Sequence, residues 1–152
     1  MINIKIPLNK NQKYIENFFI KRGLEVIVEL ANKKKPKIVN KMIVNEAYLP
    51  TLKDLYRIYQ FVLLNKRTTV LEFGSGWSTL ILSLALKELR EKFHKEVKLL
   101  RRNNPFELFA IENQKKFLNI NKKKIKKFNK NLKIKNPIKT NLCLSNVEMT
   151  LF

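Results

Sequence analysis

The sequence predicts an α/β protein in which part of a doubly wound, Rossmann-like parallel sheet follows an amino-terminal accessory α/β segment. Over the last two thirds of the chain, apolar stretches with the period of strands alternate with stretches of helical period. A glycine-containing turn joins the first of these strands to a helix, and a carboxylate stands at the end of each of the first two strands. We therefore divide the chain into an accessory segment, residues 1–50, and the first half of a cofactor-binding domain, residues 51–152.

The accessory segment begins with a short alternation of apolar and other residues that has the period of a strand, at Ile2, Ile4, Ile6 and Leu8. Apolar residues then recur with helical spacing from Tyr14 to Leu30, and Gly23 divides this stretch into two helices. A basic, proline-containing stretch at residues 33–37 predicts an exposed connection, which leads into a short apolar segment at residues 38–44.

The second part opens with a helix that we expect to end near Asn65. Thr51 can cap its amino terminus, and Asp54 stands three residues later as the acid of a short capping box. The apolar residues of this helix share one face, at Leu52, Leu55, Ile58, Tyr59, Val62 and Leu63. Residues 68–73 are β-branched and apolar, so we predict the first strand there.

The rest of the chain continues the alternation of strand and helix. After Gly74 and Gly76 a helical stripe resumes, at Leu80, Ile81, Leu84 and Leu89. Residues 106–111 form a second apolar strand, residues 115–130 a strongly basic helix, and the residues after Pro137 a third strand. The order strand, helix, strand, helix, strand predicts a parallel sheet covered by helices.

Two carboxylates flank the glycine turn in the predicted fold. Glu72 precedes Gly74 by two residues, and Glu112 ends the second strand. Because adjacent parallel strands place their carboxyl ends side by side, we expect Glu112 beside the turn, in the crevice where such sheets bind nucleotides. A carboxylate there can accept hydrogen bonds from both hydroxyls of a ribose.

The residues of the turn discriminate between two nucleotide cofactors. The dinucleotide pattern G-x-G-x-x-G requires a third glycine where this chain has Thr79. S-adenosylmethionine has no pyrophosphate and carries an ammonium group that Glu72 can attract. The turn therefore favours S-adenosylmethionine over NAD.

The sequence VLEFGSGWST at Val70–Thr79 resembles the first motif of the class I S-adenosylmethionine-dependent methyltransferases, and FAIEN at Phe109–Asn113 resembles their second. The resemblance covers roughly residues 51–152. It implies a cofactor site made of Glu72, Gly74, Ser75, Gly76, Trp77, Ser78, Thr79, Glu112 and Asn113. In such a site the two glycines line the methionine end, Glu72 lies near the amino group and Glu112 binds the ribose. We expect Trp77 to lie over the cofactor, to pack into the domain or to be exposed, and Ser78 replaces a glycine that the family commonly has.

The resemblance also implies a sheet with more strands than the three predicted here. We therefore expect the chain to be the amino-terminal part of a methyltransferase whose acceptor-side strands would follow Phe152. No catalytic residue is assigned, and the methyl acceptor, which we expect to be a small molecule, is not identified. The first strand, normally central, becomes an edge, so we expect the isolated chain to self-associate or to remain poorly packed.

The charge of the chain supports a second class of function. With 32 Lys and Arg against 12 Asp and Glu, the formal charge is +20, which attracts polyanions. Only 6 of the basic residues are arginine, whose planar fork suits phosphate and guanine. Nucleic acid is therefore not favoured, and a basic RNA-associated module without enzymatic activity is the second hypothesis. An inactive fragment without a stable cofactor site is the third.

Cysteine and histidine indicate no further chemistry. Cys143 is the single cysteine, which excludes an intrachain disulfide, and no cluster offers zinc-ligand spacing, so we expect no metal site and a reducing, cytoplasmic setting. We expect Cys143 to be buried in its strand, and His94 to lie on a solvated helix surface without a role. The apolar run at residues 80–86 is too short to cross a bilayer, and the amino terminus has no export signal.

Overall fold

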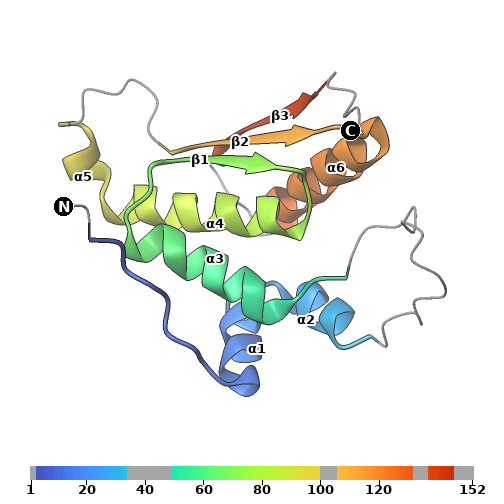
Figure 1. The fold of residues 1–152 in the computed structure, drawn as a ribbon, viewed down its shortest axis with the longest axis horizontal. Coiled ribbons are helices and arrows are strands. Elements are labelled where there is room, and N and C mark those ends of the chain that lie inside the picture. The colour runs from blue at the N-terminus through green and yellow to red at the C-terminus, as the bar shows by residue number, and fades with distance from the viewer. Residues whose placement is uncertain (1–2, 34–48, 100–105, 132–136, 146–152) are drawn as a thin grey trace, which may run out of the picture.

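The computed structural model of the protein describes residues 3–33, 49–99, 106–131 and 137–145. Within these ranges the fold is mixed α/β, as predicted, with helices packed on a three-stranded parallel sheet (Figure 1). The elements are α1 (Gln12–Ile20), α2 (Glu25–Ala31), α3 (Leu52–Leu64), β1 (Thr69–Phe73), α4 (Trp77–Lys92), α5 (His94–Val97), β2 (Glu107–Glu112), α6 (Lys115–Asn131) and β3 (Lys139–Leu144).

The sheet has the strand order β1-β2-β3, with both pairs parallel. Leu108 of β2 stands between Val70 of β1 and Thr140 of β3, which defines the register across all three strands. Helices lie in both connections between neighbouring strands, α4 and α5 in the first and α6 in the second. The predicted alternation of strand and helix is therefore confirmed for residues 52–144, apart from the stretches at 100–105 and 132–136.

Helix α4 lies between α3 and the sheet, so this part of the molecule is layered as sheet, α4 and α3 (Figure 1). Leu108 and Ala110 face the helix layer and are completely buried. On the opposite face of β1, Leu71 is 55% exposed and Phe73 is 80% exposed. Among the described residues, β1 is thus covered by helices on one face only.

The accessory segment contains the two predicted helices. Helix α1 begins after Asn11, whose side-chain Oδ1 accepts a hydrogen bond from the Tyr14 backbone N–H at 2.8 Å. Between α1 and α2, Gly23 has φ = +69°, a conformation that glycine adopts without the strain of a Cβ atom. The prediction that Gly23 divides the two helices is confirmed.

The strand predicted for residues 1–8 is wrong over the residues that the structure describes. Residues 3–8 have no regular secondary structure, and Ile4, Ile6 and Leu8 are exposed. The backbone of Lys5 pairs instead with the Asn65 side chain: its N–H donates to Oδ1 and its carbonyl accepts from Nδ2, both at 2.9 Å. Alternation alone does not form a strand, because the backbone needs a neighbouring strand to pair with. The described accessory segment is helical and irregular.

Helix α3 occupies the predicted position, but its start differs from the prediction. The Thr51 side chain makes no capping hydrogen bond, whereas its backbone carbonyl accepts from the N–H groups of Asp54 and Leu55. The predicted apolar face is buried or partly buried against the rest of the molecule. Apolar periodicity therefore placed the helix correctly, while the capping chemistry was misassigned.

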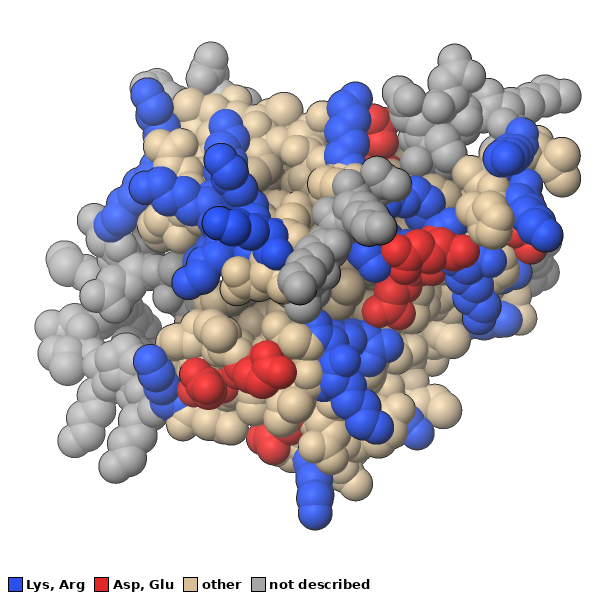
Figure 2. Space-filling view, turned by 180° about the vertical axis from the view of Figure 1, so that it is seen from behind, with Lys and Arg blue, Asp and Glu red and all other residues tan. Residues whose placement is uncertain are grey.

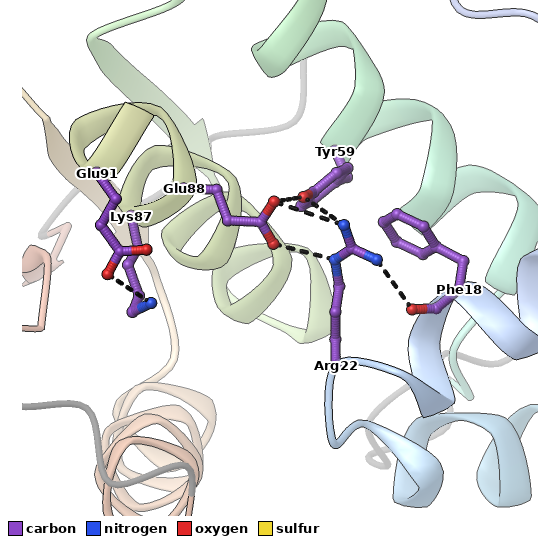
Figure 3. Close-up of polar contacts among 6 residues, drawn as sticks. All are labelled: Phe18, Arg22, Tyr59, Lys87, Glu88 and Glu91. Carbon is purple, nitrogen blue, oxygen red and sulfur yellow. Dashed lines mark hydrogen bonds and ion pairs between the residues drawn. The ribbon is translucent and has the colours of Figure 1, made fainter. Parts of the chain in front are cut away.

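The accessory helices share one hydrophobic core with α3 and α4. Phe19, Tyr59 and Ile81, from three different helices, are completely buried in it. Arg22, in the turn after α1, forms an ion pair with Glu88 of α4 at 3.0 Å, and its guanidinium stacks on the Phe18 ring (Figure 3). The Tyr59 hydroxyl donates to the same carboxylate, and burial raises the pKa of Tyr59 above its ordinary value. This cluster connects the accessory helices to α3 and α4.

Some sequence predictions fall on residues that the structure does not describe. They are most of the basic stretch at residues 33–37, the apolar segment at residues 38–44 and the loop at residues 101–105.

Candidate functional site

A pocket of about 490 Å³ opens at the carboxyl ends of β1 and β2, beside the amino terminus of α4. Such a volume lies within the usual range for small-molecule sites, about 300 to 1,000 Å³. Eight of the nine predicted site residues line it: Glu72, Gly74, Ser75, Gly76, Trp77, Ser78, Glu112 and Asn113. The ninth, Thr79, is fully buried in the first turn of α4 and is not among the lining residues. The fold thus brings together the two segments that the sequence singled out.

The glycine turn has one residue in the left-handed region. Gly74 has φ = +88°, and its N–H continues the sheet by donating to the Ile111 carbonyl at 2.7 Å. A Cβ atom placed on Gly74 would meet nothing within 4 Å, so the pocket leaves open space beside this backbone. The turn therefore needs glycine at position 74 for its conformation.

Gly76, unlike Gly74, does not have a positive φ. Its φ of −167° is extended, and a Cβ atom there would have only the Ser78 hydroxyl nearby, at 3.9 Å. The Gly76 N–H donates to Oγ1 of Thr79 at 2.9 Å, which satisfies one backbone donor at the start of α4. Thr79 thus stabilises the turn instead of lining the pocket.

Glu112 is held in place by three hydrogen-bond donors. Its Oε2 accepts from the backbone N–H of Ser75 at 3.0 Å and from the Ser75 hydroxyl at 2.8 Å, and its Oε1 accepts from the backbone N–H of Gln114 at 3.1 Å. The residue is only 6% exposed. The carboxylate therefore ties the end of β2 to the glycine turn, and Oε1 keeps a lone pair for a further donor.

Glu72 carries a buried acceptor without a donor. Its Oε1 accepts from the Ser78 hydroxyl, whereas Oε2 is buried and has no hydrogen-bond partner among the described residues. Burial is the main cause that raises the pKa of Glu72, and the nearby Glu112 charge raises it further, against the opposing effects of the Ser78 and Thr79 hydroxyls. A buried acceptor of this kind costs free energy unless a donor or cation reaches it.

Asn121 of α6 is a pocket residue that the sequence reasoning missed. It is 3% exposed, and its Nδ2 donates to the Ser75 hydroxyl at 2.9 Å and to the Phe117 carbonyl at 3.1 Å. Its Oδ1 is buried and has no partner among the described residues. The signal was present in the sequence, because Asn121 interrupts the stripe Leu118, Asn121, Ile125 and Phe128, where an apolar residue would be expected.

Lys124 also lines the pocket, and its Nζ lies 4.0 Å from the centre of the Trp77 ring. Burial lowers the pKa of Lys124. The Trp77 side chain is partly buried against the hydrophobic core, and the Lys124 ammonium group lies over its ring. The packed alternative for Trp77 therefore matches the structure, with the lysine as an addition that the sequence did not reveal.

The pocket concentrates negative charge in a strongly basic chain. Asp54, Glu72 and Glu112 line it, three of the 12 acidic residues in the whole sequence. Lys124 is the one basic residue among its described lining residues. This charge favours a ligand that brings positive charge and opposes one that brings a pyrophosphate.

His94 and Cys143, the histidine and the cysteine considered in the sequence analysis, do not line the pocket. His94 is exposed in α5, as predicted, and its Nδ1 is 3.3 Å from the Glu91 carbonyl oxygen. Cys143 is exposed, which corrects the expectation that it is buried: it points to the sheet face that no described helix covers. Among the residues that the structure describes, no group of acidic, histidine or cysteine side chains is arranged to hold a metal ion.

Comparisons with protein-family models, with curated proteins and with solved structures gave no match. In the described part of the chain, none of the helices has the length and apolar character needed to cross a bilayer. What the chain does is therefore inferred from the pocket itself.

Proposed function

We propose that the pocket at the ends of β1 and β2 binds S-adenosylmethionine, and that the chain carries the cofactor-binding part of a Rossmann-like methyltransferase. The observation that carries this proposal is the buried, unpartnered Oε2 of Glu72, next to the open space at Gly74. An ammonium group supplies the missing hydrogen-bond donor and also neutralises a carboxylate that burial disfavours.

The other pocket residues fit the same ligand. Glu112 is fixed by Ser75 and Gln114 and has acceptor capacity left for ribose hydroxyls. Asn121 donates a hydrogen bond to the Ser75 hydroxyl, and this hydroxyl in turn donates to Glu112 and holds its carboxylate in one orientation. Asn113 follows Glu112 in the lining and stays in the proposed site. These contacts pre-organise the pocket before a ligand enters.

When bound, S-adenosylmethionine supplies an electrophilic methyl group on a sulfonium. The contribution that we assign to this chain is to hold and orient the cofactor, since positioning dominates methyl transfer of this kind. We assign no catalytic residue, and we propose a small molecule as the methyl acceptor. From the single cysteine we also propose a reducing, cytoplasmic setting.

NAD is the weaker ligand for this pocket. A pyrophosphate would approach a turn flanked by Glu72 and Glu112, whose charges repel it. The position of the third glycine of the dinucleotide pattern is held by the fully buried Thr79, whose hydroxyl caps the turn.

Titration calorimetry on the whole chain tests the proposal. We expect S-adenosylmethionine and S-adenosylhomocysteine to bind and NADH not to bind, and we expect Glu72→Gln to weaken binding of the first two. Glu29→Gln is the matched control, because it makes the same change at an exposed position of α2. Absence of heat with both sulfur nucleotides, or binding that Glu72→Gln leaves unchanged, would contradict the proposal and favour an inactive fragment.

One observation supports the second candidate, a basic RNA-associated module. Helix α6 contains no acidic residue, and basic side chains gather over it on the face shown in Figure 2. Its exposed cations are Lys115, Lys116, Lys122, Lys123, Lys126, Lys127 and Lys130. Binding of single-stranded RNA would then weaken steeply with salt, with a slope of about −0.7 per phosphate neutralised. A flat salt dependence would exclude this candidate.

A further inference from the structure

Lys124 of α6 lines the pocket without an acceptor for its ammonium group. Its Nζ lies 4.0 Å from the centre of the Trp77 ring, and it has no hydrogen bond or ion pair among the described residues. The ring attracts the positive charge, but it offers no oxygen lone pair to the ammonium N–H donors. Burial alone lowers the pKa of Lys124. A partly desolvated cation of this kind is stabilised by an anionic ligand.

This cation stands apart from the carboxylates that we assign to the cofactor. Among the described residues, no ion pair joins Lys124 to Glu72 or Glu112, although all of them line the same pocket. The charge of Glu112 contributes to the pKa shift of Glu72, whereas the charge of Lys124 does not. In S-adenosylmethionine the carboxylate and the ammonium group are bound to the same carbon atom. A cofactor whose ammonium group lies at Glu72 therefore keeps its carboxylate nearby, and Lys124 is left for a second ligand.

The surroundings of Lys124 are mainly apolar. Phe117 and Ile120 line the pocket from the same face of α6, and Trp77 adds an aromatic side chain from the start of α4. Helices α4 and α6 lie side by side on one face of the sheet, so this part of the pocket belongs to the helix layer (Figure 1). A cation among apolar side chains suits an anion with an apolar body. A single ammonium group compensates one negative charge, which favours a carboxylate over a phosphate group.

We propose that Trp77, Phe117, Ile120 and Lys124 form an acceptor subsite, and that the methyl acceptor is an apolar or aromatic molecule with a single carboxylate that Lys124 binds. This inference rests on the proposed function, because it places the acceptor beside S-adenosylmethionine in the same pocket. The Lys124 ammonium group donates to the carboxylate, and the apolar side chains cover the body of the molecule. Lys124 thereby selects the acceptor, and we assign it no part in the transfer of the methyl group.

Trp77 provides the assay, because it is the one tryptophan of the sequence and its ring lies under Lys124. Its fluorescence is followed while 3-phenylpropionate, or the uncharged 3-phenylpropionamide of the same shape, is added to the whole chain at physiological salt. Each titration is made with and without saturating S-adenosylhomocysteine. We expect the carboxylate to bind with a Kd of about 0.1 to 1 mM, which is usual for a molecule of this size. The amide is expected to bind at least about tenfold more weakly, because it makes no ion pair.

Protein variants separate Lys124 from the overall charge of the chain. Lys124→Met keeps a long apolar side chain beside Trp77 but removes the cation, so we expect it to bind the carboxylate and the amide equally. Lys124→Arg restores the charge and is expected to recover the preference for the carboxylate. Lys123→Met is the matched control, because it removes the same charge at an exposed position of α6 outside the pocket, and its preference is expected to be that of the wild type. Calorimetry with S-adenosylhomocysteine reports separately on the cofactor site, and we expect Lys124→Met to leave that affinity unchanged.

Several outcomes would overturn the inference. They are equal binding of the carboxylate and the amide by the wild type, no fluorescence change at about 10 mM probe, and equal losses of preference in Lys124→Met and Lys123→Met. Competition between 3-phenylpropionate and S-adenosylhomocysteine would also overturn it, because the carboxylate of the cofactor would then occupy Lys124. If S-adenosylhomocysteine does not bind but the probe still depends on Lys124, the proposed function and the acceptor assignment both fall, and only a carboxylate site at Lys124 remains.

Discussion

Replacing Glu112 tests whether its carboxylate both fixes the glycine turn and binds the cofactor. Glu112→Gln keeps the shape of the side chain but exchanges one oxygen for an NH₂ group. If the remaining oxygen stays with the two Ser75 donors, the NH₂ faces the Gln114 N–H, now 3.1 Å from Oε1. One charge-assisted hydrogen bond is then lost outright, and such a bond contributes about 1.5 to 3 kcal/mol. We expect this loss in the free energy of unfolding.

Glu112→Ala removes all three hydrogen bonds. The Ser75 hydroxyl can turn to another acceptor, but the backbone N–H groups of Ser75 and Gln114 cannot. Two unsatisfied donors, at about 1 to 3 kcal/mol each, give an expected destabilisation of about 2 to 6 kcal/mol. The alanine variant should therefore be the less stable of the two.

Cofactor affinity is the second measurement on these variants. Two ribose hydroxyls lose a charged acceptor in Glu112→Ala, so we expect binding of S-adenosylmethionine to weaken by about 1 to 3 kcal/mol. Urea denaturation and titration calorimetry measure the two effects, with the exposed Glu29→Gln as a control expected within about 0.5 kcal/mol of the wild type. If Glu112→Gln is as stable as the control, the carboxylate does not hold the turn. If affinity is unchanged in a folded Glu112→Ala variant, Glu112 is not in the cofactor site.

Three further predictions concern the pocket and the core. Burial raises the pKa of Glu72 above its ordinary value of 4.5, so ionisation of this residue at neutral pH favours the unfolded chain. Glu72→Gln should therefore increase the free energy of unfolding at neutral pH, and this gain should disappear as the pH falls through the pKa of the folded protein to below 4.5. Denaturation curves at several pH values check this, and a pH-independent difference would contradict it. Gly76→Val should abolish cofactor binding in a folded protein: the extended backbone accepts a Cβ, which would have only the Ser78 hydroxyl nearby, but the valine methyl groups would occupy the pocket that Gly76 lines. Gly74→Ala should cost about 1 to 2 kcal/mol of stability from its positive φ. Calorimetry and thermal unfolding distinguish the two glycines, and normal binding by Gly76→Val would remove the turn from the site. A double-mutant cycle on Arg22 and Glu88 should give a coupling of about 1 to 2 kcal/mol, kept modest because both side chains are more than a quarter exposed; no coupling would mean that the ion pair does not join the accessory helices to α4.

The positions of the helices and strands followed from local patterns in the sequence. Helices α3 and α6 have apolar residues at the spacing that buries one face, and this spacing is a property of neighbouring residues. Helix α4, which lies between α3 and the sheet, is instead buried over consecutive residues from Thr79 to Leu86. Where the structure departs from the pattern, a long-range contact is responsible. The alternation in residues 3–8 lacks a partner strand, and its Lys5 backbone pairs with an Asn65 side chain 60 residues away.

Some pocket residues could likewise be predicted from local motifs, whereas others reach the pocket only through long-range packing. The turn and the two strand-end carboxylates were recognisable because their chemistry lies within short motifs at residues 70–79 and 109–113. Asn121, Lys124 and Asp54 enter the pocket from helices that only packing brings to it. Which glycine has the positive φ, and that Cys143 is exposed, also depended on the arrangement of the chain in space.

By itself, the sequence determined the alternation of strand and helix over residues 52–144, the parallel sheet and the pair of motifs that meet at its edge, because each rests on spacing along the chain. Only the tertiary structure decided that Glu72 keeps a buried oxygen without a donor and that Asn121 donates to the Ser75 hydroxyl in the same pocket. The physical reason is that burial and hydrogen-bond partners arise from contacts between residues distant in the chain, and spacing along the chain does not specify those contacts.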